Sequence, residues 1–303
     1  MKSVERFNTA PIKYIFVDNA SQPKVVERLT SVFKQLFINE YVEVGDDFKI
    51  EKTLSRFTFL KSSTNSGYAS GNNKGLRLAY QDGEIDRIII LNNDILFIED
   101  IISPLIQKMD SLEDCAIISP LLLKKNGKEI DYNCARCCPS VTDLIKLNFI
   151  MPFVWIFKLK NPKILQNQYI LIKENINNNA IIPIELPSGS CMLFKKELIH
   201  SIDGFDEHTF LYYEENILFE KINALGKQSY LSPVNKCIHL GAQTTTSSGS
   251  FFTLKEGMKS QKYFVTQYLH PHFISKMIYY ISYFNILAYN LTRDFILKLF
   301  NWK

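Results

Sequence analysis

Several common sequence features are absent or scarce, and each absence excludes a class of protein. The net charge is only +4 and no compact block of lysine and arginine stands out, so no nucleic-acid partner is expected. Residues 1–11 have no continuous apolar run of the signal-peptide type. The 6 cysteines are too scattered for a disulfide scaffold, and the cluster at 134–138 falls short of the four ligands of a structural zinc site. We therefore expect reduced thiols and a cytoplasmic protein.

Familiar nucleotide-binding motifs and long membrane spans are also missing. Residues 65–75 read NSGYASGNNKG, which is neither GxGxxG nor GxxxxGK[ST], so a dinucleotide site or a P-loop is not indicated. The most apolar stretch near the end, residues 277–291, is too short for a confident membrane span. What is present is a composition of 46% hydrophobic and 22% charged residues, which is typical of a globular protein.

Short apolar runs alternate with helical patterns through the first half of the chain. Residues 14–17, 57–60, 88–91 and 115–119 are such runs, and residues 25–36 carry apolar side chains at helical spacing. Runs that are apolar on both faces and alternate with helices are typical of a parallel sheet covered on both sides. We therefore predict an α/β fold with a mostly parallel sheet flanked by helices.

The chain is long enough for one large α/β domain with an appendage. We expect that domain over residues 1–250, with an insertion at about 120–185, and a C-terminal amphipathic helical region over residues 251–303. The C-terminal region suits a helix lying flat on a membrane surface, which predicts peripheral membrane contact. A helix that packs on the α/β domain or on a protein partner stays open as the alternative.

Polar side chains follow three of the predicted strands, where open α/β sheets place their ligands. These groups are Asp18 and Asn19, residues 65–73, and the triplet Asn92, Asn93 and Asp94. If the strands are parallel, all three groups lie at one edge of the sheet. A single carboxylate beside two amides suits a hard cation such as Mg²⁺ or Mn²⁺ that is completed by substrate phosphates. Taken alone, each group is also compatible with an ordinary turn.

The motifs VDNAS, NSGYASGNNKG, LNND, GSCMLFKKEL, GFDE, FLYYEENIL and IHLG occur in this order over roughly residues 14–245. Together they resemble family 2 glycosyltransferases of the GT-A (Rossmann-like) fold, and in particular bacterial enzymes that build O-antigen, capsule and rhamnose-containing polysaccharides. The resemblance implies an inverting enzyme that uses a UDP- or dTDP-sugar and a divalent cation (Mg²⁺ or Mn²⁺). It also implies a glycan or lipid-linked acceptor at the inner face of the cell membrane.

The resemblance assigns roles to the matching residues. Asp18 would contact the nucleotide base with Asn19 beside it, and Asp94 would bind the metal with His239 close by. The nucleotide-sugar pocket would be lined by Asn65, Gly67, Asn73, Asn92, Asn93, Gly189 and Ser190. Glu214 and Glu215 match the acidic pair in which the catalytic base is expected, because sugar transfer needs a carboxylate to take the proton of the acceptor hydroxyl. We favour Glu215 and hold Glu214 in reserve.

Without the resemblance, several of these residues have simpler interpretations. The two glutamates would complement a helix dipole, and His239 would be a hydrogen-bonded structural histidine. The family also begins with a strand that residues 1–13 are too short to hold together with its helix, so this first strand is expected to be absent. That departure favours a second hypothesis, a catalytically degenerate scaffold subunit of a polysaccharide assembly complex. A sugar nucleotidyltransferase is a further alternative, although no glycine-rich basic loop follows the first strand.

Overall fold

The structure is a computed structural model that describes residues 1–8, 10–38, 40–49, 53–158, 166, 168–172, 180–241 and 250–299. Its helices are α1 (Lys2–Phe7), α2 (Pro23–Leu36), α3 (Gly67–Gln81), α4 (Ile102–Asp110), α5 (Val141–Ile156), α7 (Lys196–Ser201), α8 (Glu214–Ala224), α9 (Ser250–Gln267) and α10 (Phe273–Leu299), with short 3₁₀ turns at Tyr132–Cys134 and Ile170–Ile172. Its strands are β1 (Tyr14–Asn19), β2 (Tyr41–Val44), β3 (Phe57–Ser62), β4 (Arg87–Leu91), β5 (Ile95–Phe97), β6 (Cys115–Leu123), β7 (Ala135–Arg136), β8 (Ile182–Ile184), β9 (Leu186–Pro187), β10 (Cys191–Lys195) and β11 (Gln228–His239).

The first sheet is three-stranded and wholly parallel, in the order β1-β3-β2. Helix α2 packs on it through aromatic rings, with Phe33 stacked on Phe16 at 4.6 Å between ring centroids. Parallel pairing places the carboxyl ends of β1 and β3 together, so that Asp18 stands opposite Lys61 and Asn19 opposite Ser62. The predicted helix over residues 25–36 is confirmed, but Val25, Val32 and Leu36 on it are exposed.

The second sheet is mixed, in the order β4-β10-β6-β11-β5, with β8 paired to β11. Strands β6 and β11 are parallel, whereas β10 runs antiparallel to both β4 and β6, and β5 runs antiparallel to β11. Every residue of β6 is buried, as expected for a central strand covered on both faces. The α/β fold is therefore confirmed, and the parallel arrangement holds for part of the second sheet because β5 and β10 run in the opposite direction.

Strands β1 and β4 are each paired on one side only within the described residues. The described residues that precede β1 form helix α1, which packs against β5. Val4 of this helix is buried in the main apolar core, and the backbone N–H of Phe97 donates to Ser3 Oγ at 3.2 Å. The described residues thus place a helix, and no strand, ahead of β1.

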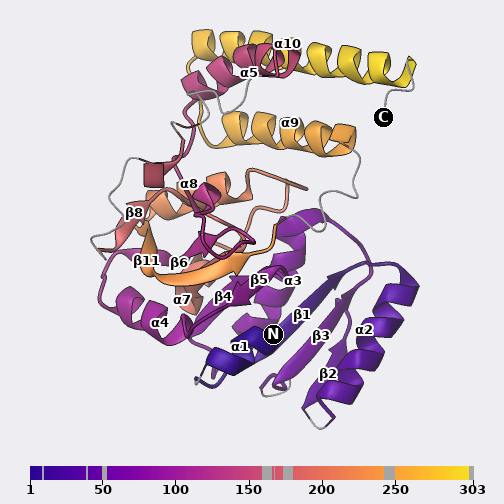
Figure 1. Cartoon of the computed structure of the whole chain (residues 1–303), viewed down its shortest axis with the longest axis vertical. Helices are drawn as coiled ribbons and strands as arrows, with labels where there is room; N and C mark the ends of the chain where they lie inside the picture. Colours follow the sequence, from indigo (N-terminus) through magenta and orange to yellow (C-terminus); the bar gives the residue numbers. More distant parts are fainter. Residues whose placement is uncertain are drawn as a thin grey trace.

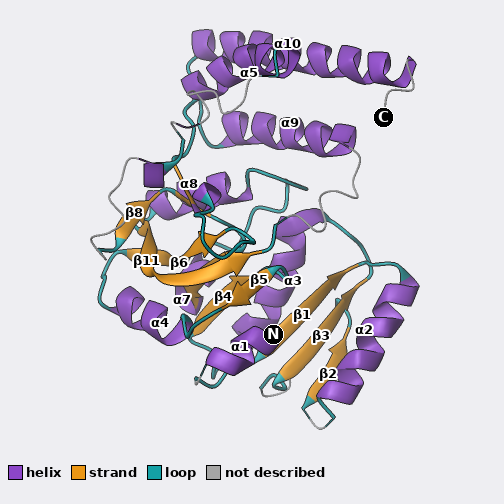
Figure 2. Cartoon of the chain, in the orientation of Figure 1, coloured by secondary structure: helices purple, strands orange, loops and turns teal. Residues whose placement is uncertain are grey.

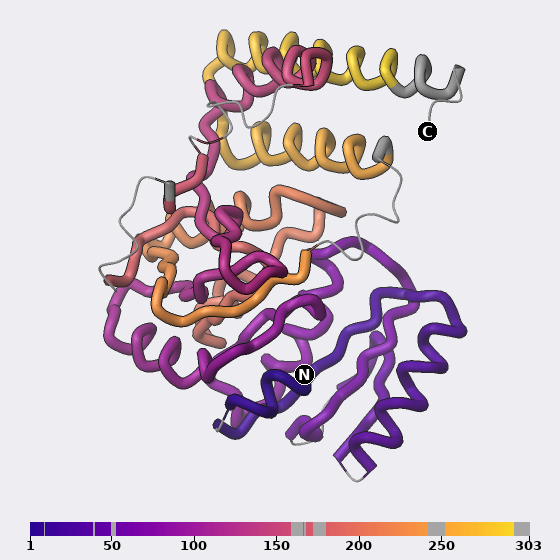
Figure 3. The backbone as a smooth tube through the Cα atoms, in the orientation of Figure 1, coloured from indigo at the N-terminus to yellow at the C-terminus, as the bar shows by residue number. Residues whose placement is uncertain are grey.

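The C-terminal helices stack on one side of the α/β body, with α9 next to α8 and the pair α5 and α10 beyond it (Figures 1 and 2). Helix α5 comes from the expected insertion, yet it packs against α10, so segments far apart in sequence lie side by side (Figure 3). One apolar cluster joins Leu144, Ile217, Phe264 and Tyr279 from these four helices. The predicted C-terminal helical extension is confirmed. Residues 159–165, 173–179 and 242–249, which include parts of the expected insertion, lie outside the described residues.

Two absences concern the described part of the chain. None of its helices is both long and apolar enough to cross a bilayer. None of the six cysteines, all of which lie in the described part, forms a disulfide bond, and four of them, including Cys134, are buried.

Candidate functional site

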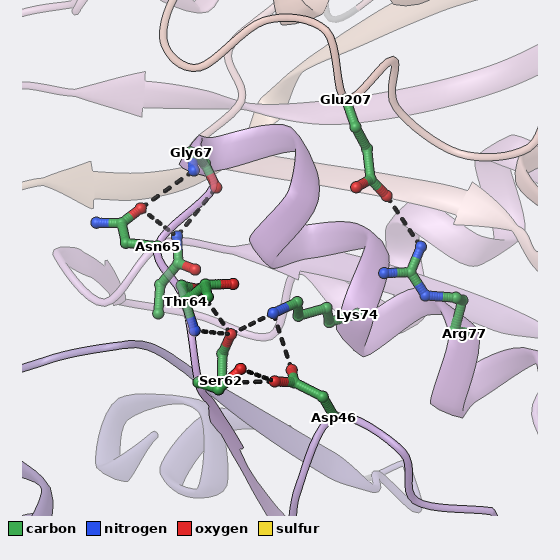
Figure 4. Close-up of polar contacts among 10 residues, drawn as sticks. Asp46, Ser62, Thr64, Asn65, Gly67, Lys74, Arg77 and Glu207 are labelled. Carbon is green, nitrogen blue, oxygen red and sulfur yellow. Dashed lines mark hydrogen bonds and ion pairs between the residues drawn. The ribbon is translucent and has the colours of Figure 1, made fainter.

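The carboxyl end of β1 is tied to the turn that follows β3. The side-chain amide of Asn19 donates to Asn65 Oδ1 and to the carbonyl of Gly67, both at 3.0 Å. Asn65 Oδ1 also accepts from the backbone N–H of Gly67 at 3.1 Å, and Figure 4 shows Asn65 turned toward Gly67 at the start of α3. The structure thus brings together three of the predicted nucleotide-sugar-binding residues. The same close-up shows Lys74 reaching toward Ser62 and Asp46.

Asp18 is buried at the end of β1, and its carboxylate accepts from the backbone N–H of Ser21 at 3.1 Å. An open pocket of about 380 Å³ lies beside it, lined by residues of β1, α2 and the end of β3. Asp94, His239 and Glu215 do not line this pocket. Of the predicted site residues, Asp18 alone lines this pocket.

Gly67 allows both the turn after β3 and the close packing of the loop before α8 on that turn. Its φ is +96°, and an added Cβ would lie 2.2 Å from the carbonyl oxygen of Phe210. The backbone N–H of Tyr68 donates to that same carbonyl at 3.1 Å. Only glycine allows the loop before α8 to come this close to the start of α3.

Asn73 secures the same loop from the interior of α3. Its amide donates to the carbonyl of Phe205 at 2.8 Å and to Glu207 at 2.9 Å, and its Oδ1 accepts from the N–H of Phe205 at 2.9 Å. Both ends of this buried amide are therefore occupied within the protein. Its predicted contact with a nucleotide sugar stays a prediction, while its role in holding the GFDE loop is visible.

Asp94 and His239 meet at the ends of β4 and β11. Asp94 Oδ2 lies 3.4 Å from His239 Nε2, and Asp94 Oδ1 is buried without a hydrogen-bond partner. The other imidazole nitrogen, Nδ1, lies 2.9 Å from Asp131 Oδ2. The hydrogen bond to Asp131 raises the pKa of His239, and the same bond lowers the pKa of Asp131. Asp131 was not identified from the sequence, since none of the motifs noted there includes it.

The turn of residues 188–190 connects this pair to the acidic pair of α8. Ser190 Oγ lies 3.5 Å from His239 Nε2, and the Ser190 carbonyl accepts from the N–H of Asn92 at 2.9 Å. One residue earlier, the N–H of Gly189 donates to Glu215 Oε1 at 3.0 Å. The turn therefore contacts the Asp94 side and the Glu215 side of the site at consecutive residues. Asn93 is exposed beside this group.

Tyr68 is a second residue that the sequence analysis missed as a site member. Its hydroxyl donates to the carbonyl of Gly189 at 2.6 Å and thereby fixes the peptide next to Glu215. Burial, followed by the nearby charge of Glu215, raises the pKa of Tyr68 well above its usual value. The tyrosine therefore acts as a neutral hydrogen-bond donor. Its place directly after Gly67 in the NSGYASGNNKG motif was the available signal.

Glu214 and Glu215 begin helix α8 in different environments. Glu214 is 5% exposed, and its Oε1 has no hydrogen-bond partner, whereas Glu215 is half-buried and contacts Gly189. Burial, and secondly the charge of Glu215, raises the pKa of Glu214 from 4.5 to about 8. At neutral pH Glu214 is therefore mostly protonated.

This shift predicts a pH-dependent change in stability. The pKa of Glu214 is higher in the folded than in the unfolded protein, so its ionisation lowers the free energy of unfolding. The contribution of Glu214 to that free energy is therefore full below about pH 4.5 and is lost as the pH rises to about 8. Replacing it with neutral glutamine removes that loss, so Glu214→Gln should raise the melting temperature by several degrees at pH 8 and little at pH 4.5. Thermal unfolding across this range tests it, with Glu197→Gln on the exposed face of α7 as control. An equal shift at every pH would contradict the burial argument.

The backbone that leads into α8 is strained and is held by α9. Tyr212 and Tyr213 both have φ of 70°, a left-handed conformation that is costly for side chains of this size. Helix α9 supports this turn: Ser260 Oγ donates to the carbonyl of Leu211 at 2.9 Å, and the amide of Gln261 donates to the Tyr213 hydroxyl at 2.9 Å. Strain that the surroundings maintain beside the acidic pair supports a functional role for this turn.

The surroundings of Asp94 offer part of the ligand set of a divalent cation. Within the described residues, no group of three or more His, Cys, Asp or Glu side chains is placed to hold a metal. Asp94 nevertheless offers a buried oxygen without a partner, with His239 Nε2 beside its other oxygen. One carboxylate and one imidazole fit a cation whose remaining ligands come from a diphosphate and water.

Comparisons with known proteins agree with this architecture. The model of the family described as "Glycosyl transferase family 2" matches residues 1–202. No curated protein matches the chain. Among solved structures, GalNAc-T7 with UDP, GalNAc and Mn²⁺ matches with a TM-score of 0.55 and 13% identity, over 88% of this chain and 45% of that one.

A mannosyltransferase, PcManGT from Pyrobaculum calidifontis, in complex with GDP-Man and Mn²⁺, is more distant, with a TM-score of 0.47, 12% identity and coverage of 95% and 68%. The chain thus spans 45% of the length of GalNAc-T7, and that likeness concerns the fold alone. The family model carries the assignment, because it covers well over half of the sequence. The chain belongs to glycosyltransferase family 2.

Proposed function

We propose that this protein is an inverting glycosyltransferase that moves a sugar from a nucleoside-diphosphate donor to a hydroxyl group of a glycan acceptor. The observation that carries the proposal is the turn of residues 188–190, which contacts Glu215 through Gly189 and His239 through Ser190. The same turn therefore contacts two groups. One is a carboxylate suited to proton removal, and the other is a carboxylate–imidazole pair suited to a metal-bound diphosphate. Direct displacement between these two groups inverts the anomeric carbon.

Glu215 is the residue that we assign as the general base. Its carboxylate is half-buried and is oriented by the N–H of Gly189, whereas the raised pKa of Glu214 leaves that neighbour protonated at neutral pH. A base must be unprotonated to accept the proton of the acceptor hydroxyl. Glu214 then serves as a neutral, buried neighbour at the start of α8.

Asp94 and His239 are assigned to the leaving-group side. When bound there, a divalent cation would neutralise the charge that gathers on the departing diphosphate. Asp131 holds the His239 ring by its Nδ1 and so keeps Nε2 directed at Asp94. Asp18, which lines the pocket beside β1, is assigned to the nucleoside, together with the hydrogen-bonded group of Asn19, Asn65 and Gly67 that follows it.

The finer identity of the substrates is also part of the proposal. GalNAc-T7 was solved with UDP and Mn²⁺, which supports a UDP- or dTDP-sugar and a cation of this kind. The acceptor that we propose is a lipid-linked glycan of cell-surface polysaccharide synthesis, of the O-antigen or capsule type, at the inner face of the cell membrane. The apolar C-terminal helices support an acceptor held at a membrane.

A direct assay tests the enzyme proposal. We expect slow hydrolysis of one or more UDP- or dTDP-sugars in the presence of Mn²⁺, with free sugar and nucleoside diphosphate detected by mass spectrometry. NMR spectra recorded directly after release of the sugar should show the anomeric configuration opposite to that of the donor.

A second candidate is a non-catalytic scaffold subunit. The observation that favours it is the free edge of β1, which no described strand pairs and which carries Asp18 of the predicted nucleoside site. A scaffold would neither bind nor hydrolyse any nucleotide sugar. Absence of both activities over a panel of donors would therefore replace the enzyme proposal with this one.

Gly189 provides a further prediction about the base. A Cβ at this position would lie 2.7 Å from Glu215 Oε1 and 2.9 Å from the Tyr68 hydroxyl, so Gly189→Ala must displace the carboxylate. Because a misplacement of about 1 Å costs on the order of 100-fold in rate, we expect a fall in kcat of that size. Gly83→Ala is the matched control, since nothing lies within 4 Å of its added Cβ. Equal kcat values for the two variants would contradict the proposed contact.

A further inference from the structure

Helices α5 and α10 pack against each other and both expose apolar side chains, and we call these exposed sides together the α5/α10 face. On α10 the exposed side chains Ile274, Met277, Ile278, Ile281 and Phe284 recur at three- and four-residue spacing, which places them along one side of the helix. The paired helix α5 adds Phe153, which is 58% exposed. A large contiguous apolar patch on a folded protein marks an interaction surface.

The inward sides of the same helices form an apolar cluster that also contains buried polar side chains. Asn148 of α5 is buried and donates to Gln261 Oε1 of α9 at 3.0 Å and to Ser282 Oγ of α10 at 3.4 Å. Asn290, also buried, donates to the carbonyl of Ile286 at 2.7 Å. The Asn148 hydrogen bonds therefore join α5 to α9 and α10 within the apolar cluster, while the Asn290 bond lies within α10 itself.

The exposed apolar side chains on the outward side are the part of this distribution that water disfavours. In water, helices bury apolar side chains and expose polar ones, because exposing apolar area and burying amides both cost free energy. In contact with hydrocarbon, exposed apolar side chains cost nothing, and inward polar groups hold helices together through hydrogen bonds. The α5/α10 face therefore matches a lipid environment better than an aqueous one.

The charges beside this face select the kind of lipid. Lys146 and Lys158 are exposed at α5, and Lys276 is exposed at α10. Asp143 is the one acidic residue among the described side chains at 141–158 and 273–293. Exposed lysines beside an apolar helix face are attracted to anionic headgroups. Trp155, stacked on Tyr289 and on the Arg293 guanidinium, supplies aromatic rings of the type that lie at headgroup depth.

We propose that the α5/α10 face binds an anionic lipid bilayer and lies in its interfacial plane. The inference deepens the proposed function, because it names the surface that would bring the catalytic domain to a membrane-held acceptor. Helix α9 lies between this face and the α/β body, and through Ser260 it contacts the loop before the acidic pair (Figure 1). A bilayer on this face would therefore stand one helix layer away from Glu214 and Glu215.

Vesicle co-sedimentation of the full chain without nucleotide sugar tests the proposal. We expect binding to vesicles of phosphatidylcholine with phosphatidylglycerol, and weaker binding to phosphatidylcholine alone. Ile281→Glu and Phe153→Glu should each lower the partition coefficient about tenfold or more, because each replaces an exposed apolar side chain that would contact the bilayer with a charge. Leu36→Glu on α2 is the matched control, since Leu36 is 52% exposed against 60% for Ile281. Thermal unfolding of each variant confirms that it is folded.

Three results would overturn the proposal. The first is no binding of the wild-type chain to anionic vesicles, and the second is equal binding of the folded α10 and control variants. The third is a concentration-dependent dimer in sedimentation velocity that Ile281→Glu dissolves, without vesicle binding, since a second copy would then cover the face. Donor hydrolysis is measured separately in the absence of vesicles, so failure of the lipid proposal is distinguishable from failure of the enzyme proposal.

Discussion

Glu215→Gln is expected to lower kcat for sugar transfer or donor hydrolysis by about 10² to 10⁴-fold. The glutamine keeps the shape of the side chain and an oxygen for the N–H of Gly189, which lies 3.0 Å from Glu215 Oε1. The glutamine cannot accept a proton from the acceptor hydroxyl, so only the rate of the chemical step should fall. The dissociation constant of UDP or dTDP, measured calorimetrically with Mn²⁺, should stay within about twofold of the wild-type value, because the base acts in the chemical step.

Glu214→Gln is the matched comparison for this experiment. Glu214 is adjacent, buried and protonated at neutral pH, so the neutral amide imitates the form that it already adopts. We expect this variant to keep kcat within about tenfold of the wild type. The opposite ranking, with Glu214→Gln inactive and Glu215→Gln active, would transfer the role of base to Glu214.

Asp94→Asn is expected to lower kcat/KM for the donor by about 100-fold or more. The substitution removes the negative charge from the oxygen atoms next to His239, one of which is buried without a hydrogen-bond partner. Loss of this charge weakens the binding of a divalent cation and, through it, of the diphosphate. Calorimetry of UDP binding with and without Mn²⁺ should therefore show a large Mn²⁺ effect for the wild type and a small one for the variant.

A carboxylate elsewhere serves as the control for Asp94. Asp110→Asn removes one exposed charge at the end of α4, where Asp110 pairs with Arg87. It should leave the Mn²⁺ effect on nucleotide binding unchanged, because a surface ion pair contributes little even to stability. If Asp94→Asn and Asp110→Asn bind UDP with the same Mn²⁺ dependence, the assignment of Asp94 to the metal fails.

The fold was largely predictable from the order of apolar runs. Residues 14–17, 57–60, 88–91 and 115–119 each became strands, because a run that is apolar on both faces has few stable placements other than a covered sheet. The directions of β5 and β10 were not predictable, since hydrophobic periodicity carries no information on whether a strand runs parallel or antiparallel to its neighbour. The outward position of Val25, Val32 and Leu36 on α2 was missed for a related reason: spacing predicts a helix but not the amount of surface that covers it.

The candidate site was likewise predictable from the sequence only in part. Motif order alone indicated Asp94, His239, Glu214 and Glu215, because the family's chemistry requires those residue types near those strand ends. Tertiary structure decided how the two glutamates differ, since burial of Glu214 and the contact of Glu215 with Gly189 depend on packing between α8 and the turn before β10. Asp131 and Tyr68 could be placed at the candidate site only from the structure. Their hydrogen bonds to His239 and Gly189 span 108 and 121 residues of sequence.

The sequence by its local patterns therefore determined the class of fold, the family and the residue types of the candidate site. Those properties depend on the periodicity within short segments and on the order of short motifs, both of which can be read along the chain without knowing its folded contacts. The tertiary structure alone decided which glutamate is buried, which side chains hold the histidine, and which face of α5 and α10 remains apolar and exposed. They depend on desolvation and contact between segments far apart in the chain, and no local pattern specifies either.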